Sequence, residues 1–313
     1  WISANDVDGA SGQITYTQWL NAEGRLEADL TVTKLAADRF FVVVTDTMVR
    51  HAEAWMKRNI PADAHAFVTD VTSGVAQLNV QGPRSRELLQ SLTSADLSNE
   101  AFPFRAAREI DIGYARVLCV RITYIGELGY ELYIPAEQAA HVHECIVAAG
   151  GKFGLVHAGL RALGSLRMEK GYRDYGHDLD NTDDPYETGL GFAIDLKKPG
   201  GFLGKDALLA RKASGPLRRR LVSVVLQDPA PLLFHAEVLL RDGVPVGYVR
   251  AASYGHTLGG AVGLALVEPK GVDAVDAAYL GSGRWEVDIA GRRCPATVSL
   301  KPPYDPMAER IRR

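Results

Sequence analysis

A tyrosine and a carboxylate in the N-terminal region stand where a hairpin would bring them together. Residues 12–32 form an alternating polar and apolar run, a short turn cluster and a second alternating run, which predicts two paired strands. In this hairpin Tyr16 and Asp29 lie near one another. Asp29 stands between Ala28 and Leu30, an apolar setting that is costly for a carboxylate without a partner or a chemical task. We expect a proton acceptor beside an aromatic wall; the alternative is a carboxylate that hydrogen-bonds its own backbone.

Strand and helix patterns alternate irregularly along the first two thirds of the chain, which is typical of α+β layers rather than a regular doubly wound sheet. Strands are predicted over 14–20, 30–35, 39–44, 75–80, 115–124 and 129–134. Helices are predicted over 47–59, 83–92, 136–149 and 158–172. The last of these helices ends in a polar, aromatic segment over residues 172–176.

The composition changes after residue 196, where glycine and proline clusters precede a short helix and a linker. From residue 218 onward, short strands alternate with glycine-containing turns, the pattern of a small antiparallel barrel. We therefore predict a larger region over 1–211 and a separate C-terminal β-barrel domain over 218–313.

Bulk properties exclude several classes of protein. With 313 residues, 47% hydrophobic, and a formal net charge of −3, the chain gives no reason to expect nucleic acid or an anionic membrane surface as a partner. Cys119, Cys145 and Cys294 fit neither a disulfide framework nor a metal-ligand spacing, and predict buried free thiols in a reducing compartment. His141 and His143 do not share a helix face, so no metal site is expected there.

Five motifs spread over the chain resemble one family. They are Tyr-Thr-x-x-Leu-Asn-x-x-Gly-x-x-x-x-Asp-Leu-Thr-Val from Tyr16, and the segments 78–83, 124–131, 165–172 and 187–192. This set resembles the glycine-cleavage T-protein (aminomethyltransferase) family. Leu163 stands where the T-proteins carry a folate-contacting arginine, and the segments 168–173 and 200–204 are more similar to the folate modules of dimethylglycine and sarcosine dehydrogenases.

The resemblance implies a T-protein-like multi-domain arrangement around a central tetrahydrofolate site. Asp29 matches the acidic catalytic residue of the family, and Ala28 replaces a neighbouring second acid. Glu131 matches the carboxylate that binds the pterin edge; the alternative is a strand residue facing solvent. Tyr16, Tyr124 and Tyr172 match positions that flank the folate; the alternative for each is a half-buried core residue.

The function implied is a tetrahydrofolate-binding one-carbon transfer module of a flavin-dependent dimethylglycine or sarcosine dehydrogenase. It would form 5,10-methylenetetrahydrofolate from the iminium of a methylated amine, and FAD would belong to an upstream flavin domain. In the family the triplet Asn5-Asp6-Val7 lies well inside the domain, so we expect further sequence before Trp1. A cytoplasmic location is expected, or the mitochondrial matrix in a eukaryote. The alternatives are a stand-alone aminomethyltransferase that works with a lipoyl carrier, and a non-enzymatic folate-binding protein.

Overall fold

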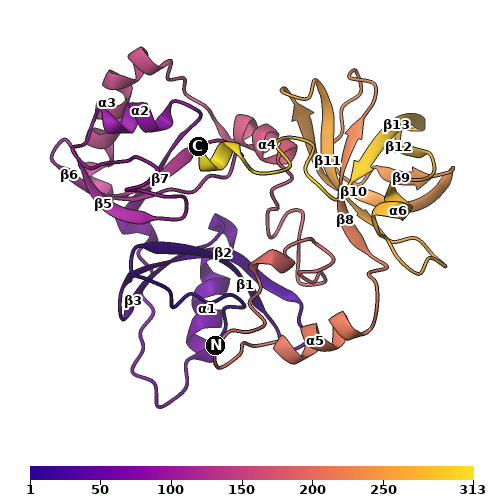
Figure 1. Cartoon of the computed structure of the whole chain (residues 1–313), viewed down its shortest axis with the longest axis horizontal. Coiled ribbons are helices and arrows are strands. Elements are labelled where there is room, and N and C mark those ends of the chain that lie inside the picture. Colours follow the sequence, from indigo (N-terminus) through magenta and orange to yellow (C-terminus); the bar gives the residue numbers. More distant parts are fainter.

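Three β-sheets organise the chain in the computed structural model, which describes residues 1–313. One sheet has the strand order β1-β2-β3, the second has the order β4-β7-β6-β5, and the third is a closed barrel. Figure 1 shows the sheets in three separate lobes, with α4 and the segment that follows it at the centre. The last residues leave the barrel and return to the lobe that carries β7.

The first lobe is a three-stranded antiparallel sheet with a helix on one face. Its elements are β1 (Gln13–Leu20), β2 (Leu26–Ala36), β3 (Arg39–Val43) and α1 (Val49–Asn59). Because side chains alternate along a strand, Leu30 and Val32 face α1 and pack with its Trp55, whereas Asp29 and Tyr16 occupy the opposite face. The helix therefore fixes which side of the hairpin is left for chemistry.

The second lobe is a four-stranded antiparallel sheet covered by two helices on one face. Its elements are β4 (Val75–Gln81), α2 (Ser85–Gln90), β5 (Ala107–Ile112), β6 (Ala115–Val120), β7 (Gly129–Pro135) and α3 (Ala139–Gly150). Leu132 and Ile134 of β7 are buried in the core that includes Val142 of α3. Glu131 and Tyr133 alternate with them and face the other way.

The open faces of the first two sheets meet. Phe41 of β3 packs edge-on against Tyr133 of β7, with 5.0 Å between ring centroids. Phe41 lies opposite Thr33, which shares its sheet face with Asp29, four residues away on β2. The faces that carry Asp29 and Glu131 are therefore turned toward one another.

A central helix joins the second lobe to the barrel. This helix, α4 (Leu160–Glu169), packs on strand β10, where Ser165 donates to the Tyr254 carbonyl at 2.6 Å. At the end of α4 the buried Glu169 accepts the backbone N–H groups of Thr257 and Leu258 at 2.7 and 2.9 Å. A long segment then runs past the first lobe to α5 (Lys205–Ala213).

The third lobe is a closed antiparallel barrel with the strand order β10-β11-β8-β13-β12-β9. Its elements are β8 (Arg220–Leu226), β9 (Val238–Arg241), β10 (Val244–Gly255), β11 (Gly260–Val267), α6 (Ala277–Leu280), β12 (Trp285–Ile289) and β13 (Arg292–Ser299). Neighbouring strands approach closely at Gly247, where an added Cβ would lie 1.8 Å from the Leu266 carbonyl oxygen. The predicted C-terminal barrel and the α+β fold are confirmed.

The element boundaries differ from the sequence-based ones in a few places. Strand β5 (Ala107–Ile112) was not predicted, because its exposed charged residues leave only a weak alternation. The strand predicted over 115–124 ends at Val120, and Cys145 is half-buried rather than buried. Short 3-10 helices lie at Asp46–Met48, Thr72–Gly74, Ala136–Gln138, Gly151–Phe153, Gly191–Ala193 and Arg310–Arg312. No helix is both long enough and apolar enough to cross a lipid bilayer.

Candidate functional site

The Asp29 carboxylate is held by two side chains of the neighbouring strand. The Tyr16 hydroxyl donates to Oδ2 at 2.8 Å, and the Gln18 side-chain nitrogen donates to Oδ1 at 2.9 Å. The predicted proximity of Tyr16 and Asp29 is confirmed, and the carboxylate bonds side chains rather than its own backbone. Burial raises the pKa of Asp29 to about 6, against the opposing effect of these two hydrogen bonds.

Arg173 lies close to this carboxylate, and sequence reasoning did not select it. Its positive charge lowers the pKa of both Asp29 and Tyr16, although burial dominates both groups. Burial also lowers the pKa of Arg173 itself. The signal in the sequence was the polar segment 172–176 at the end of a helix, which mixes charged and aromatic residues where little core is available.

The structure brings two further predicted tyrosines together beside this cluster. The rings of Tyr124 and Tyr172 are stacked, with centroids 5.9 Å apart and planes at 20°. The Tyr124 hydroxyl donates to the Arg173 carbonyl oxygen at 2.5 Å. Burial raises the pKa of Tyr124, and the negative charge of Asp29 adds to this effect. Burial raises the pKa of Tyr172 to about 12. Both tyrosines are half-buried.

Glu131 stands on the facing sheet. Its Oε2 accepts the Tyr133 hydroxyl at 2.6 Å, and burial raises the pKa of Glu131. Glu131 is half-buried and bonded to a neighbouring side chain. Its assignment as the pterin ligand stays a prediction, as do the roles of the tyrosines.

These four groups form a half-buried polar cluster. Asp29, Tyr16, Arg173 and Glu131 each keep part of their surface accessible, yet burial is the largest influence on the pKa of every one of them. Next to Asp29, the buried carbonyl oxygen of the Gln18 amide has no hydrogen-bond partner.

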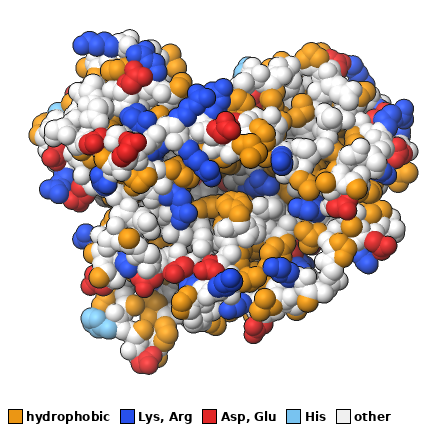
Figure 2. Space-filling model, in the orientation of Figure 1, with side chains coloured by type: hydrophobic (Ala, Val, Ile, Leu, Met, Phe, Trp, Pro, Cys, Tyr) orange, Lys and Arg blue, Asp and Glu red, His pale blue; other side chains and the backbone are white.

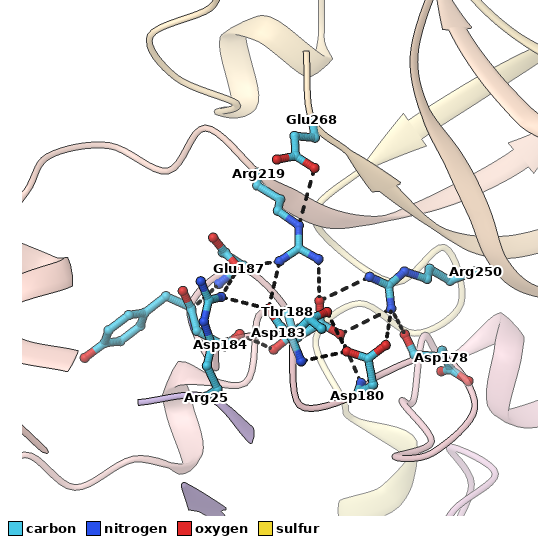
Figure 3. A network of polar contacts seen from close by, with 12 residues as sticks. Arg25, Asp178, Asp180, Asp183, Asp184, Glu187, Thr188, Arg219, Arg250 and Glu268 are labelled. Atoms are coloured by element: carbon cyan, nitrogen blue, oxygen red, sulfur yellow. Dashed lines mark hydrogen bonds and ion pairs between the residues drawn. The ribbon is translucent and has the colours of Figure 1, made fainter. Parts of the chain in front are cut away.

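A network of ion pairs holds the segment after α4 against the barrel (Figure 3). Asp183 is 1% exposed and accepts from Arg219 at 2.8 Å and from Arg250 at 3.2 Å, both on the barrel side. Glu187 accepts from Arg219 at 2.9 Å and from Arg25, in the β1–β2 turn, at 3.3 Å. The network therefore connects the hairpin, the central segment and the barrel.

Two protein-family models match the sequence of this chain. The model of the GCVT N-terminal domain matches residues 1–198, and that of the glycine cleavage T-protein C-terminal barrel domain matches residues 219–305. The chain belongs to the glycine cleavage T-protein family. A solved aminomethyltransferase T of the glycine cleavage system from Bartonella henselae shares the fold, with a TM-score of 0.78 and 23% identity over 95% of this chain and 78% of that one.

Two curated relatives of this T-protein family member are oxidoreductases by name. The present chain is 44% identical over 307 residues to the 4-methylaminobutanoate oxidase (formaldehyde-forming) of Paenarthrobacter nicotinovorans, and the alignment covers 98% of this chain and 36% of that protein. It is 34% identical over 328 residues to the mitochondrial sarcosine dehydrogenase of Mus musculus, covering 100% and 35%. The chain thus spans about a third of the length of these relatives.

One acidic cluster of this T-protein family member has the composition of a cation site. Asp174, His177 and Asp178 place ligand atoms within 4.8 Å of one another. However, Asp178 is fully buried and its Oδ2 already accepts from the Arg167 guanidinium at 2.7 Å. An added cation would compete with that charge, so we assign the cluster to holding the turn after α4.

Proposed function

We propose that the chain binds tetrahydrofolate and forms 5,10-methylenetetrahydrofolate from the iminium of an N-methyl amine, as a module of a dehydrogenase of the dimethylglycine or sarcosine type. The observation that carries the proposal is the desolvated Asp29 carboxylate held by Tyr16 and Gln18, in a family member that aligns along its whole length with such oxidoreductases. Membership of the T-protein family supports tetrahydrofolate as the ligand.

The hydrogen-bonding groups and aromatic rings of this polar cluster suit a reduced pterin. A pterin edge presents adjacent N–H donors, and Glu131 has one carboxylate oxygen that no protein donor occupies, since Tyr133 bonds only Oε2. The stacked pair of Tyr124 and Tyr172 offers a flat aromatic wall. We propose these residues as the binding set.

Asp29 is the proposed proton acceptor. Tetrahydrofolate supplies two amine nitrogens that bond to the iminium carbon, and the amine leaves with the two protons those nitrogens lose. When it is ionised, above its pKa of about 6, Asp29 can receive one of these protons at a carboxylate oxygen and pass it to the departing amine. Tyr16 and Gln18 orient the two oxygens, so that the acceptor stays in place while it is desolvated.

The donor is proposed to arise on an upstream flavin domain. The two relatives are a dehydrogenase and an oxidase, and about two thirds of each lies outside the aligned region. Oxidation of an N-methyl amino acid by FAD on such a domain gives an iminium, and this module would capture its carbon. Sarcosine and 4-methylaminobutanoate, the amines in the relatives' names, define the proposed donor class.

Calorimetric titration with tetrahydrofolate under anaerobic conditions tests the binding step. We expect the purified chain to bind tetrahydrofolate, and Glu131→Ala to weaken binding about tenfold or more, because one charge-assisted pair is lost. Glu109→Ala is the matched control, since the Glu109 side chain is 56% exposed on β5. Equal affinity of the wild type and Glu131→Ala would refute the assigned contact, and no binding by the wild type would refute the function.

The main alternative is a stand-alone aminomethyltransferase. Such an enzyme would take its one-carbon unit from an aminomethyl group on a lipoyl carrier protein rather than from a free iminium. Single-turnover assays with the two donors separate the alternatives, because only the proposed module should form 5,10-methylenetetrahydrofolate faster with the N-methyl amino acid iminium. A complete reading frame without a dinucleotide-binding domain would favour the transferase.

A further inference from the structure

Arg173 carries a half-buried positive charge that no carboxylate bonds. Its Nε donates to the Thr188 carbonyl at 3.0 Å and its Nη1 donates to the Gly171 carbonyl at 2.5 Å. These acceptors are neutral, and the third guanidinium nitrogen, Nη2, has no protein acceptor. A buried guanidinium usually pairs with an anion, because its desolvation is costly. Nη2 of Arg173 is therefore available to donate a hydrogen bond to an anionic group.

The neighbouring arginines are satisfied differently. Arg167 pairs with Asp178 at 2.7 Å, and Arg250 and Arg219 pair with the same carboxylate, that of Asp183. Arg121 is also buried without a carboxylate, yet both of its terminal nitrogens already donate to backbone carbonyls. Among these arginines, Arg173 is the one that lacks a carboxylate partner and also has a terminal nitrogen, Nη2, that donates to no protein group.

The free nitrogen of Arg173 lies over an exposed glycine, Gly189. A Cβ added to Gly189 would meet Nη2 at 2.9 Å, and Gly189 has a φ of +74°, in the left-handed region that favours glycine. The guanidinium is close enough to Asp29 and Tyr16 for its charge to lower the pKa of both. An anionic group of a ligand bound beside Asp29 would thus meet an unpaired N–H donor.

We propose that Arg173 binds the carboxylate of the one-carbon donor, so that the module selects iminium ions carried on amino acids over those of simple amines. The inference rests on the proposed function and names its substrate class. Such a donor is a zwitterion, with a cationic iminium at one end and a carboxylate at the other. Asp29 and Arg173 form a complementary pair of charges, which orients the iminium carbon toward the proton acceptor.

A carboxylate could also come from the glutamyl tail of tetrahydrofolate. The position of Arg173 beside Asp29, which is the reactive end of the site under the proposed function, favours the donor. The two sources differ in a measurable way: an arginine that binds the tail controls folate affinity, whereas an arginine that binds the donor controls discrimination between amines.

The test uses sarcosine and sarcosinamide as probes of the chain saturated with tetrahydrofolate. At pH 7 both carry an ammonium group in place of the iminium, and only sarcosine has a carboxylate. We expect calorimetry to show sarcosine binding about tenfold or more tightly, and Arg173→Gln to abolish this preference while tetrahydrofolate affinity changes less than about threefold. Arg173→Lys keeps the charge and should retain part of the preference. Arg116→Gln is the control, because the Arg116 side chain is 72% exposed.

Several outcomes would overturn the inference. They are equal binding of the two probes by the wild type, an unchanged preference in Arg173→Gln, and a loss confined to tetrahydrofolate affinity, which would assign Arg173 to the tail. If Arg173→Gln loses its circular dichroism signature, Gly189→Ala supplies the test, since its Cβ displaces Nη2 while the arginine remains. A wild type that binds no tetrahydrofolate fails the proposed function instead, which keeps the two failures distinct.

Discussion

The Tyr16 hydroxyl donates a 2.8 Å hydrogen bond to Oδ2 of Asp29 across the β1–β2 pair. The two residues are not direct partners in the register, because Tyr16 lies opposite Thr31 and Asp29 lies opposite Gln18. The bond is therefore diagonal, which a long aromatic side chain can span. It keeps the desolvated carboxylate of Asp29 in one orientation.

Replacing the carboxylate should affect the chemical step more than binding. For Asp29→Asn we expect the rate of methylene transfer to fall by about a hundredfold to ten-thousandfold, the usual contribution of a positioned general base. Tetrahydrofolate affinity, measured by calorimetry, should change only a few-fold. A variant that retains more than half of the wild-type rate would remove Asp29 from the mechanism.

The pH profile should report the raised pKa of Asp29. Because the ionised carboxylate is the acceptor, the transfer rate should rise with pH through about 6 and then level off. Tyr16→Phe removes a hydrogen bond that favours the ionised form, so its midpoint should move to higher pH. Measured rates from pH 4.5 to 8 in both proteins test this, and identical midpoints would contradict it.

The free energy of unfolding should also depend on pH through the Asp29 carboxyl group. A carboxyl whose pKa is higher in the fold than in the unfolded chain favours the protonated folded state. The contribution of Asp29 to the free energy of unfolding should therefore decrease as pH rises from about 4 to about 6, the interval between its ordinary and its raised pKa. Urea unfolding of the wild type and Asp29→Asn at both ends of that interval measures it, and the difference should grow toward pH 6.

The aromatic wall should contribute to ligand affinity through its face. Tyr172→Ala should weaken tetrahydrofolate binding about tenfold, since an aromatic contact is worth about 0.5–1.5 kcal/mol beyond its buried area. Tyr172→Phe keeps the ring and should stay within about twofold. If calorimetry shows the alanine variant binding like the wild type, Tyr172 is a core residue only.

The ion-pair network should hold the barrel to the central segment. Asp183→Ala leaves Arg219 and Arg250 without their shared buried partner and should lower the free energy of unfolding by about 3–5 kcal/mol. The matched control is Asp273→Ala, because the Asp273 side chain is 98% exposed in its pair with Arg218 and should change stability by less than about 0.5 kcal/mol. Urea titration monitored by fluorescence and circular dichroism compares them.

Much of the fold was predictable because it depends on local pattern. The two strand patterns and the turn between them predicted the hairpin of β1 and β2, so the proximity of Tyr16 and Asp29 followed from the sequence. The barrel was predictable from short strands between glycine turns. Strand β5 was missed, because exposed Arg108, Glu109 and Asp111 interrupt the apolar pattern that would mark it.

Composition gave no reason to expect nucleic acid or an anionic membrane surface as a partner of this chain. Residue types and motifs in the sequence selected Asp29, the three tyrosines and the family. The tertiary structure alone decided that Arg173 lies beside Asp29 and that the faces of Asp29 and Glu131 turn toward one another. Periodicity determines which face of one element is buried, whereas the meeting of two faces depends on contacts between residues far apart in the sequence. Desolvation of a charge follows from that packing, so neither the raised pKa of Asp29 nor the unpaired nitrogen of Arg173 could be inferred from the chain alone.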